Sequence, residues 1–287
     1  MRGLKAARLQ QEFPMPAIFL LAIQPTLRVT QEQVDAFSRD GYLAIPAITT
    51  QEEVARLRVI YDRLFETKAG RENGDQFDLG GTDEDGKAEA LPQILNPVKY
   101  APELAETLFR ANAFAIASQL LGPGTQARGE HAILKPARFG KETPWHQDEA
   151  YWSPEVEYHA LSVWMPLQEA TLANGCMQFV PGSHQLEVLP HHCINHDPRI
   201  HGLEVDDPEQ VVKNPVACPL PPGGATFHLN RTLHFAGPNR SEIPRRAYIL
   251  GFGLPNKPAQ TPRDYYWNRL KETPREERRK AAQKKKE

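Results

Sequence analysis

The feature that most constrains the fold is a series of short apolar runs in the second half of the chain. After Gly124 these runs cover residues 131–134, 161–167, 176–180, 225–229 and 247–252, and turn signals separate them at 173–176, 181–183, 221–224 and 237–239. Many short strands with closely spaced turns are typical of a jelly-roll or cupin-like barrel. Asn174-Gly175 between two apolar runs also predicts a hairpin. We therefore predict a mainly β protein with flanking helices and a double-stranded β-helix core at about residues 126–255.

The first half of the chain carries helix signals instead. Thr30-Gln31-Glu32-Gln33 is a capping box, and a second N-cap signal begins at Thr50. A further helical region covers about 102–121. We expect these helices to pack outside the barrel and to form one domain with it, at residues 29–270. The expected flanking segments are a loosely ordered N-terminal extension at 1–28, a mobile glycine- and acid-rich loop at 69–90, and a polar basic tail at 271–287.

Composition narrows the classes of partner. The formal net charge of -2 provides no overall field that would recruit nucleic acid or an anionic membrane. The apolar run at 17–23 is too short to span a bilayer, and no small-x-small cleavage motif follows it. Three cysteines without a C-x-x-C pair indicate a reducing compartment, so we expect a cytoplasmic protein.

The His146-Gln147-Asp148 triplet is the first candidate for chemistry. Alternate residues of an extended chain point to the same side, so His146 and Asp148 can converge on one metal ion. Two histidines and one carboxylate form the facial triad of non-haem Fe(II) oxygenases. A lone His-x-Asp triplet is also common in surface loops, so the hypothesis requires a second, distant histidine.

His234 has the best context for that second histidine, because a turn follows it and a strand begins near Arg245. An antiparallel return would place Arg245 beside the strand of His234, with Arg246 facing the opposite way. A guanidinium there can bind a carboxylate through two hydrogen bonds, as the distal carboxylate of 2-oxoglutarate requires. The histidines near Cys193 offer a zinc site as an alternative, although their spacing favours a solvated loop. These histidines are His191, His192, His196 and His201.

Taken together, these motifs resemble the phytanoyl-CoA dioxygenase family of Fe(II)/2-oxoglutarate oxygenases over about residues 29–255. The matching elements are Lys135-Pro136, Trp145-His146-Gln147-Asp148, Trp164, Asn174-Gly175-Cys176, Pro181-Gly182-Ser183-His184, and His234 with Arg245 eleven residues later. The match is specific as a set, whereas no single element of it is.

The resemblance implies that His146, Asp148 and His234 bind Fe(II) and that Arg245 binds the distal carboxylate of 2-oxoglutarate. It also implies that O2 is the second cosubstrate and that Trp164 lines the cosubstrate pocket. Further cosubstrate contacts are implied, by a looser alignment, for Lys135, Gln93 and His131.

Two positions refine this reading. The family often has serine or threonine two residues after the distal histidine, where this chain has Ala236, so one hydrogen bond to the cosubstrate is missing or comes from elsewhere. Related halogenases have a small residue where this chain has Asp148, so the resemblance implies hydroxylation, with succinate and CO2 as coproducts.

Two other functions fit the same residues. One is a catalytically silent barrel that binds a small acid or a protein partner, and the other is a zinc-dependent hydrolase that uses the same triad. Retention of all three metal-binding residues weighs against the silent barrel, and Arg245 weighs against the hydrolase. We expect a small organic metabolite as substrate, and a monomer or homodimer. The sequence does not specify the substrate.

Overall fold

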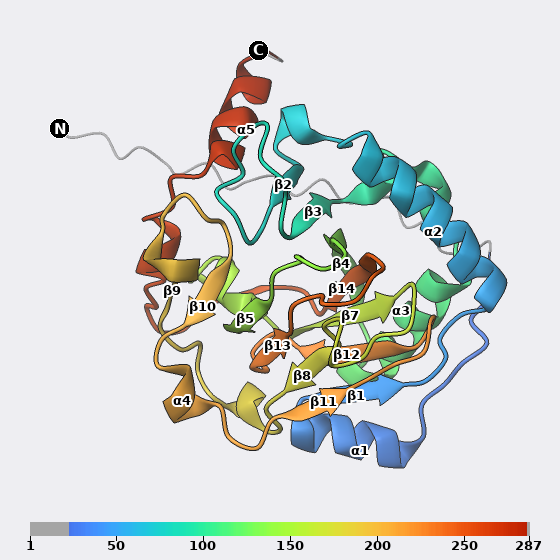
Figure 1. The fold of residues 1–287 in the computed structure, drawn as a ribbon. Helices are drawn as coiled ribbons and strands as arrows, with labels where there is room; N and C mark the ends of the chain where they lie inside the picture. The colour runs from blue at the N-terminus through green and yellow to red at the C-terminus, as the bar shows by residue number, and fades with distance from the viewer. Residues whose placement is uncertain (1–22, 286–287) are drawn as a thin grey trace.

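The structure is a computed structural model that describes residues 23–285, and its core consists of two antiparallel β-sheets (Figure 1). The large sheet has the order β1 (Tyr42–Ile45), β12 (Ala225–Leu229), β7 (Ala160–Pro166), β14 (Arg245–Gly253), β4 (Gln126–Lys135), β3 (Pro92–Leu95) and β2 (Gln76–Asp78). The small sheet has the order β11 (Val216–Cys218), β8 (Met177–Phe179), β13 (His234–Ala236) and β5 (Thr143–His146). The expected jelly-roll type of fold is confirmed.

Shorter elements connect these strands. Two-stranded sheets are formed by β9 (His191–Cys193) with β10 (Leu203–Val205), and by β6 (Val156–Glu157) with β15 (Lys257–Pro258). The helices are α1 (Gln31–Asp40), α2 (Gln51–Glu66), α3 (Leu108–Leu121), α4 (Pro208–Val211) and α5 (Pro274–Lys284). Single 3-10 turns are η2 (Arg71–Asn73), η3 (Pro97–Lys99), η4 (Pro102–Leu104), η5 (Asp148–Tyr151), η6 (Ser183–Gln185), η7 (Ile194–His196) and η8 (Tyr266–Asn268).

The N-terminal helices begin where the capping signals predict. Thr30 accepts a hydrogen bond from the Gln33 backbone N–H while the Gln33 side chain accepts from that of Thr30, so the capping box is formed. Thr50 and Thr107 cap α2 and α3 by accepting from the backbone N–H groups of Glu53 and Arg110, without the reciprocal bond, and α3 begins at Leu108, later than the expected start near 102. Gly41 ends α1 with a φ of 81°, a conformation that favours glycine.

Strand alternation gives the large sheet two different faces. One face packs Val163, Phe227 and Tyr248 against α2 and α3, which lie on the outside of the molecule (Figure 1). The other face carries Trp164 and Ala247 toward the small sheet. Three strands of the large sheet, β1, β2 and β3, precede residue 126, so the expected core range of 126–255 omits them. Among the described residues, no strand pairing closes the two sheets into one barrel.

The segment 69–90 is not the mobile loop that its composition suggested. It contains η2 and β2, and the buried Asp78 carboxylate accepts hydrogen bonds from the backbone N–H groups of Gly80, Ala90 and Leu91. Arg71 forms an ion pair with Asp83 in the same segment. The sequence suggested that these acidic residues face solvent. In the structure they accept hydrogen bonds from backbone N–H groups and from a guanidinium instead.

The Asn174-Gly175 hairpin is also a wrong prediction. The turn connects β7 of the large sheet to β8 of the small sheet, and these two strands do not pair with each other. Gly175 has a φ of 87°, and a Cβ there would lie 2.2 Å from the Gly237 carbonyl oxygen. Close approach of two backbones explains this glycine, rather than a two-residue hairpin turn.

Replacing Gly175 with alanine is expected to destabilise the protein more than the same change at Gly86. Gly86 has a similar φ of 82° but no atom within 4 Å of its virtual Cβ, so Gly86→Ala adds only backbone strain, about 1–2 kcal/mol. Gly175→Ala adds a clash with backbone, for which overpacking suggests roughly 1–3 kcal/mol more. Chemical denaturation of the two variants measures the difference, and equal losses of unfolding free energy would contradict the close approach.

Both ends of the described chain are held against the domain. Most of the expected N-terminal extension lies outside the described residues, but Thr26 and Leu27 donate backbone hydrogen bonds to Asn112 on α3. The basic C-terminal segment forms α5, which lies beside β2 (Figure 1). Arg275 Nε donates to the Gly74 carbonyl oxygen at 2.9 Å. This segment is therefore a docked helix rather than a solvated tail.

No helix in residues 23–285 is long and apolar enough to cross a membrane.

Candidate metal centre

His146, Asp148 and His234 come together between the two sheets. His146 ends β5 and pairs directly with His234 at the start of β13, while Asp148 begins η5. Their candidate ligand atoms all lie within 4.8 Å of one another. Gln147 has extended backbone angles, so the residues on either side of it face the same way, as the triplet predicted.

Hydrogen bonds fix the orientation of both imidazole rings. His146 Nδ1 lies 2.7 Å from the Pro144 carbonyl oxygen, and His234 Nδ1 lies 2.9 Å from that of Thr232. A carbonyl oxygen only accepts, so each Nδ1 carries the proton and each Nε2 presents a lone pair. Burial, with the neighbouring His234, lowers the pKa of His146, which keeps its ring neutral and able to bind a metal.

The Asp148 carboxylate divides its two oxygens between two sets of partners. Oδ1 lies 3.7 Å from His146 Nε2 and 3.5 Å from His234 Nε2. Oδ2 accepts a hydrogen bond of 2.7 Å from the Ser162 hydroxyl and lies 3.5 Å from His228 Nε2. Although burial alone raises it, the neighbouring His234, His146 and His228 hold the pKa of Asp148 well below its usual range. Oδ1 is thus the oxygen that faces a shared metal position.

Two neighbours of this carboxylate, Ser162 and His228, escaped the sequence reasoning. The His228 ring is buried, and its centroid lies 4.5 Å from that of His234. The available signal was the alternation of polar Thr226 and His228 within the apolar strand β12. That strand lies beside β7, so a polar residue on its inner face lies close to the centre.

Arg245 points into the space between the sheets, but not for the reason that the sequence suggested. The expected return beside His234 is wrong, because β13 belongs to the small sheet whereas β14 pairs with β4 and β7 of the large one. Arg245 stands opposite Lys135, and its guanidinium carbon lies 5.4 Å from the Trp164 ring centroid. Arg246 faces away and binds Asp62 on α2 through Nε at 2.7 Å, as alternation predicted.

Arg245 is 1% exposed, and within residues 23–285 neither its Nε nor its Nη1 has a hydrogen-bond partner. Burial lowers its pKa from 12.5 to about 9, so the guanidinium remains charged at neutral pH. A buried cation without an anion is costly. The donor set therefore fits an anionic guest that binds between the sheets.

The remaining cosubstrate candidates lie on the same inner face. Gln93 and His131 occupy alternating inward positions of β3 and β4. Lys135 is fully buried and donates to the carbonyl oxygens of Ala236 and Gly237, both at 2.7 Å. Two of its three ammonium hydrogens are therefore already used by β13 and the turn after it.

The histidine-rich segment at 191–201 does not form a second metal site, because within residues 23–285 only the His146, Asp148 and His234 group brings three such donors together. The expectation of a solvated loop is nevertheless wrong for His191. This residue is buried in β9, where its Nε2 accepts from the Gln147 backbone N–H at 3.2 Å.

Of the residues directly after the triplet, Tyr151 lies beside the centre and Glu149 does not line it. The Tyr151 ring centroid is 6.1 Å from that of His146. Glu149 is buried and forms ion pairs with Arg231 and Arg263. Glu149 therefore holds the start of η5 in place instead of lining the substrate side.

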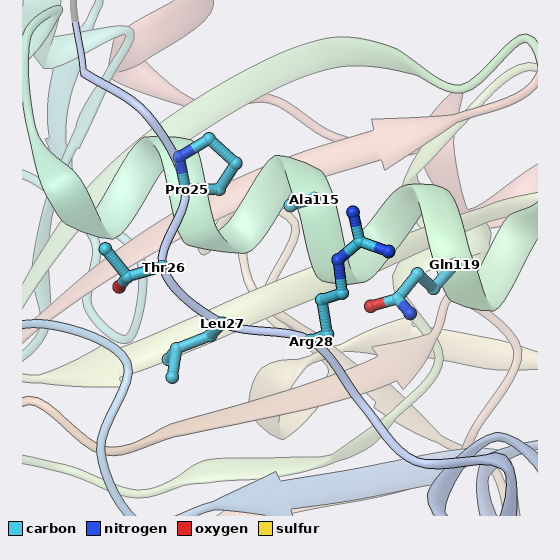
Figure 2. A pocket seen from close by; sticks show the side chains of 6 residues that line it. All are labelled: Pro25, Thr26, Leu27, Arg28, Ala115 and Gln119. Atoms are coloured by element: carbon cyan, nitrogen blue, oxygen red, sulfur yellow. The ribbon is translucent and has the colours of Figure 1, made fainter.

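A separate hollow of about 560 Å³ lies on the helical side of the molecule. Figure 2 shows Pro25, Thr26, Leu27 and Arg28 alongside α3, from which Ala115 and Gln119 face them. Because α3 packs on the outer face of the large sheet, this hollow is distinct from the space that holds the two histidines and the carboxylate.

Comparison with known proteins agrees with this geometry. The family model "Phytanoyl-CoA dioxygenase (PhyH)" matches residues 37–247. The chain is 28% identical over 233 residues to an ectoine dioxygenase of Bordetella parapertussis, covering 76% of this chain and 73% of that protein. It is 25% identical over 224 residues to a probable alpha-ketoglutarate-dependent hypophosphite dioxygenase of Stutzerimonas stutzeri, covering 77% of each.

Solved structures give the same result. EvdO2 from Micromonospora carbonacea var. aurantiaca superposes with a TM-score of 0.72 at 39% identity, covering 85% of this chain and 99% of that one. A second structure of EvdO2 is complexed with 2-oxoglutarate, with a TM-score of 0.71 at 38% identity and the same coverage.

The chain belongs to the phytanoyl-CoA dioxygenase family. It is an Fe(II)- and 2-oxoglutarate-dependent dioxygenase, and O2 is its second cosubstrate.

Proposed function

We propose that the enzyme hydroxylates a small organic metabolite, with His146, Asp148 and His234 as the iron ligands. The convergence of their candidate ligand atoms within 4.8 Å is the observation that carries this assignment. Iron with bound 2-oxoglutarate supplies O2 activation and oxidation of an unactivated C–H bond, with succinate and CO2 as coproducts. Asp148 occupies the position that a small residue leaves open in related halogenases, which favours hydroxylation.

The chain's own contribution is orientation, charge and exclusion of water. Backbone carbonyls hold both Nε2 atoms toward the iron position, and Ser162 occupies Asp148 Oδ2, which leaves Oδ1 as the ligand. Outer partners of this kind fix ligand geometry before the metal binds. Turnover then requires no rearrangement of these side chains.

Arg245 is proposed to bind the distal carboxylate of 2-oxoglutarate, with Trp164 as the adjacent wall. The unpartnered Nε and Nη1 of Arg245 and the contact of its guanidinium with the Trp164 ring support this role. Lys135, Gln93 and His131 are proposed to line the same pocket, since their positions on β3 and β4 share its face.

Thr226 is proposed to supply the hydrogen bond that Ala236 cannot make. Its hydroxyl is buried and has no hydrogen-bond partner in the part of the chain that the structure describes, and Thr226 stands directly opposite Trp164 in the strand pairing. Thr226→Val keeps the shape of the side chain and removes the donor. Because a hydrogen bond to a charged carboxylate contributes about 1.5–3 kcal/mol, we expect roughly ten- to hundredfold weaker 2-oxoglutarate binding. Anaerobic titration with 2-oxoglutarate at saturating Fe(II) measures it, and unchanged affinity would remove Thr226 from the pocket.

Anaerobic addition of Fe(II) and 2-oxoglutarate to the purified protein tests the proposed function. We expect the weak visible charge-transfer band of the iron chelate, followed by succinate release when O2 and a substrate are supplied. A silent barrel that binds a small acid would give no such band. A zinc hydrolase would bind Zn²⁺ without responding to 2-oxoglutarate, and a screen of metabolites by succinate release would identify the substrate class.

The cellular setting is part of the same proposal. We propose a cytoplasmic enzyme that acts as a monomer or homodimer on a small molecule, without a nucleic-acid or membrane partner. Cys176, Cys193 and Cys218 are all buried and free, which supports a reducing compartment. Size-exclusion chromatography with light scattering measures the oligomeric state.

A further inference from the structure

A group of cationic side chains lies next to the metal centre and is not used by any role assigned so far. We call Lys271, Arg275 and Arg279, together with the adjacent imidazole of His201, the cation cluster. Burial and these three cations hold the pKa of His201 well below its usual range, so its ring is neutral. The Lys271 ammonium lies 4.7 Å from the Tyr151 ring centroid, and the Arg275 guanidinium carbon lies 4.5 Å from that of Phe77.

His201 connects the two aromatic rings. Its imidazole stacks on Tyr151 with centroids 6.0 Å apart and meets Phe77 edge-on at 4.9 Å. The Tyr151 ring in turn lies 6.1 Å from the ring of His146. One aromatic side chain therefore separates Lys271 from a proposed iron ligand, which is a short enough span for one small molecule to contact both places.

The charges of the cation cluster are poorly balanced. Within the described residues, Glu276 is the only carboxylate that pairs with its members, at 3.0 Å from Arg279 and 4.0 Å from Arg275, and Lys271 forms no ion pair. The His201 Nδ1 atom is buried without a hydrogen-bond partner. Burial lowers the pKa of Lys271 to about 8, as expected for a cation that lacks an anion.

Helix docking alone does not account for this arrangement. Arg278 on the same helix docks α5 through an ion pair with the buried Asp83, so a cation with a purely structural role is neutralised here. Arg275 uses its Nε for the Gly74 carbonyl but turns the rest of its guanidinium over Phe77. Partly buried positive charge in excess of the carboxylates around it is a common feature of anion sites.

We propose that the cation cluster binds an anionic group of the substrate, a phosphate or a carboxylate, while the C–H bond to be oxidised lies at the metal. The proposal rests on the proposed function, because it takes the iron centre as the place of reaction. It defines the substrate as a small acid that is long enough to pass the Tyr151 ring. The C-terminal segment, rather than the barrel, would then recognise the anionic group of the substrate.

The test uses the full-length protein loaded with Co(II) in place of iron and saturated with 2-oxoglutarate, with inorganic phosphate as the probe. We expect phosphate to bind and its ³¹P relaxation to be enhanced by the nearby paramagnetic ion. Lys271→Gln removes a charged donor and should weaken phosphate binding about tenfold or more. Lys280→Gln removes the same charge from an exposed position of α5 and should leave binding unchanged. Acetate in place of phosphate shows which anionic group is preferred.

Three results would overturn the proposal. Equal phosphate affinity in the Lys271→Gln and Lys280→Gln proteins would show that only overall charge matters. Bound phosphate without enhanced relaxation would place the anion elsewhere, and enhanced relaxation that survives Lys271→Gln would show direct binding to the metal. Thermal melting without anions checks that both variants fold, and Arg275→Gln provides a second variant of the cluster. A Co(II) spectrum that does not respond to 2-oxoglutarate would instead count against the proposed function.

The pH dependence of stabilisation by sulfate is an independent test of the cation cluster, because the charge of sulfate is constant above neutral pH. Lys271 is a cation below a pKa of about 8, so stabilisation by sulfate should be present at pH 7 and decline as the pH rises through 8. The other groups that face Lys271 are Cys193, Tyr151, Arg275, Glu276 and His201, and the pKa of His201 lies well below this range. Burial raises the pKa of the Cys193 thiol and of Tyr151, so these two stay neutral over that range. Thermal shift measurements that show no decline would contradict a role for the Lys271 ammonium.

Discussion

Replacement of Asp148 by alanine is expected to abolish turnover while the protein stays folded. The change removes one of three proposed ligands, and two imidazoles alone hold a divalent ion weakly. The lost side chain is a partly exposed carboxylate among polar groups, so no apolar cavity forms. The Ser162 hydroxyl loses one hydrogen-bond partner. We expect this loss to lower the free energy of unfolding by about 1–3 kcal/mol. Succinate release measures turnover, and equilibrium dialysis against Fe(II) or Co(II) measures the metal.

Asp35→Ala provides the matched control. Asp35 is an exposed aspartate on α1 whose carboxylate accepts only from Gln31 in the same helix, so its loss should affect neither metal binding nor turnover. Normal turnover in the purified Asp148→Ala protein would show that the carboxylate is not a ligand. Unfolding of that variant before metal is added would show that the carboxylate has mainly a structural role, and Asp148→Asn would then separate ligation from packing.

Arg245→Lys is expected to weaken 2-oxoglutarate binding by one to two orders of magnitude with little effect on iron affinity. Lysine keeps the positive charge but lacks the planar fork that binds a carboxylate through two hydrogen bonds. A charged hydrogen bond contributes roughly 1.5–3 kcal/mol, or about ten- to hundredfold in affinity. Burial of the guanidinium makes the enzyme more dependent on this contact. The measurement is the apparent affinity for 2-oxoglutarate at saturating iron.

Arg246→Lys is the control with the same chemistry on the opposite face. Lysine can keep the single ion pair with Asp62 on α2, so 2-oxoglutarate affinity should be unchanged. Sensitivity at Arg246 without sensitivity at Arg245 would mean that the inward face of β14 is misassigned. Insensitivity of both positions would refute the assignment of Arg245 to the cosubstrate.

The sequence was informative where chemistry is local. The capping box at Thr30 predicted the start of α1, and the extended backbone at Gln147 brought His146 and Asp148 to one side. Alternation separated Arg245 from Arg246 because the period of a strand is two, whichever neighbours the strand has. These inferences need only the rules of one element.

The sequence was not informative where the answer depends on which elements meet. Arg245 belongs to a different sheet from His234, and no local pattern distinguishes that crossover from a hairpin. The partners of Asp148 at Ser162 and His228 come from β7 and β12, which are distant in the chain. The docking of α5 depends on single contacts such as that of Arg278 with Asp83, and a run of charges looks the same whether it is paired or solvated.

The two-faced large sheet has a consequence for how this enzyme can be changed. Along β14, residues 245, 247 and 249 face the chemistry, whereas 246, 248 and 250 face the helices. Residues that shape the active site and residues that stabilise the fold therefore alternate along β14. Substitutions at Ile249 should change the shape of the active site, and substitutions at Leu250 should change thermal stability. We expect their effects on the free energy of unfolding to be almost additive when they are combined. Interference between them would reveal that the sheet transmits strain from one face to the other.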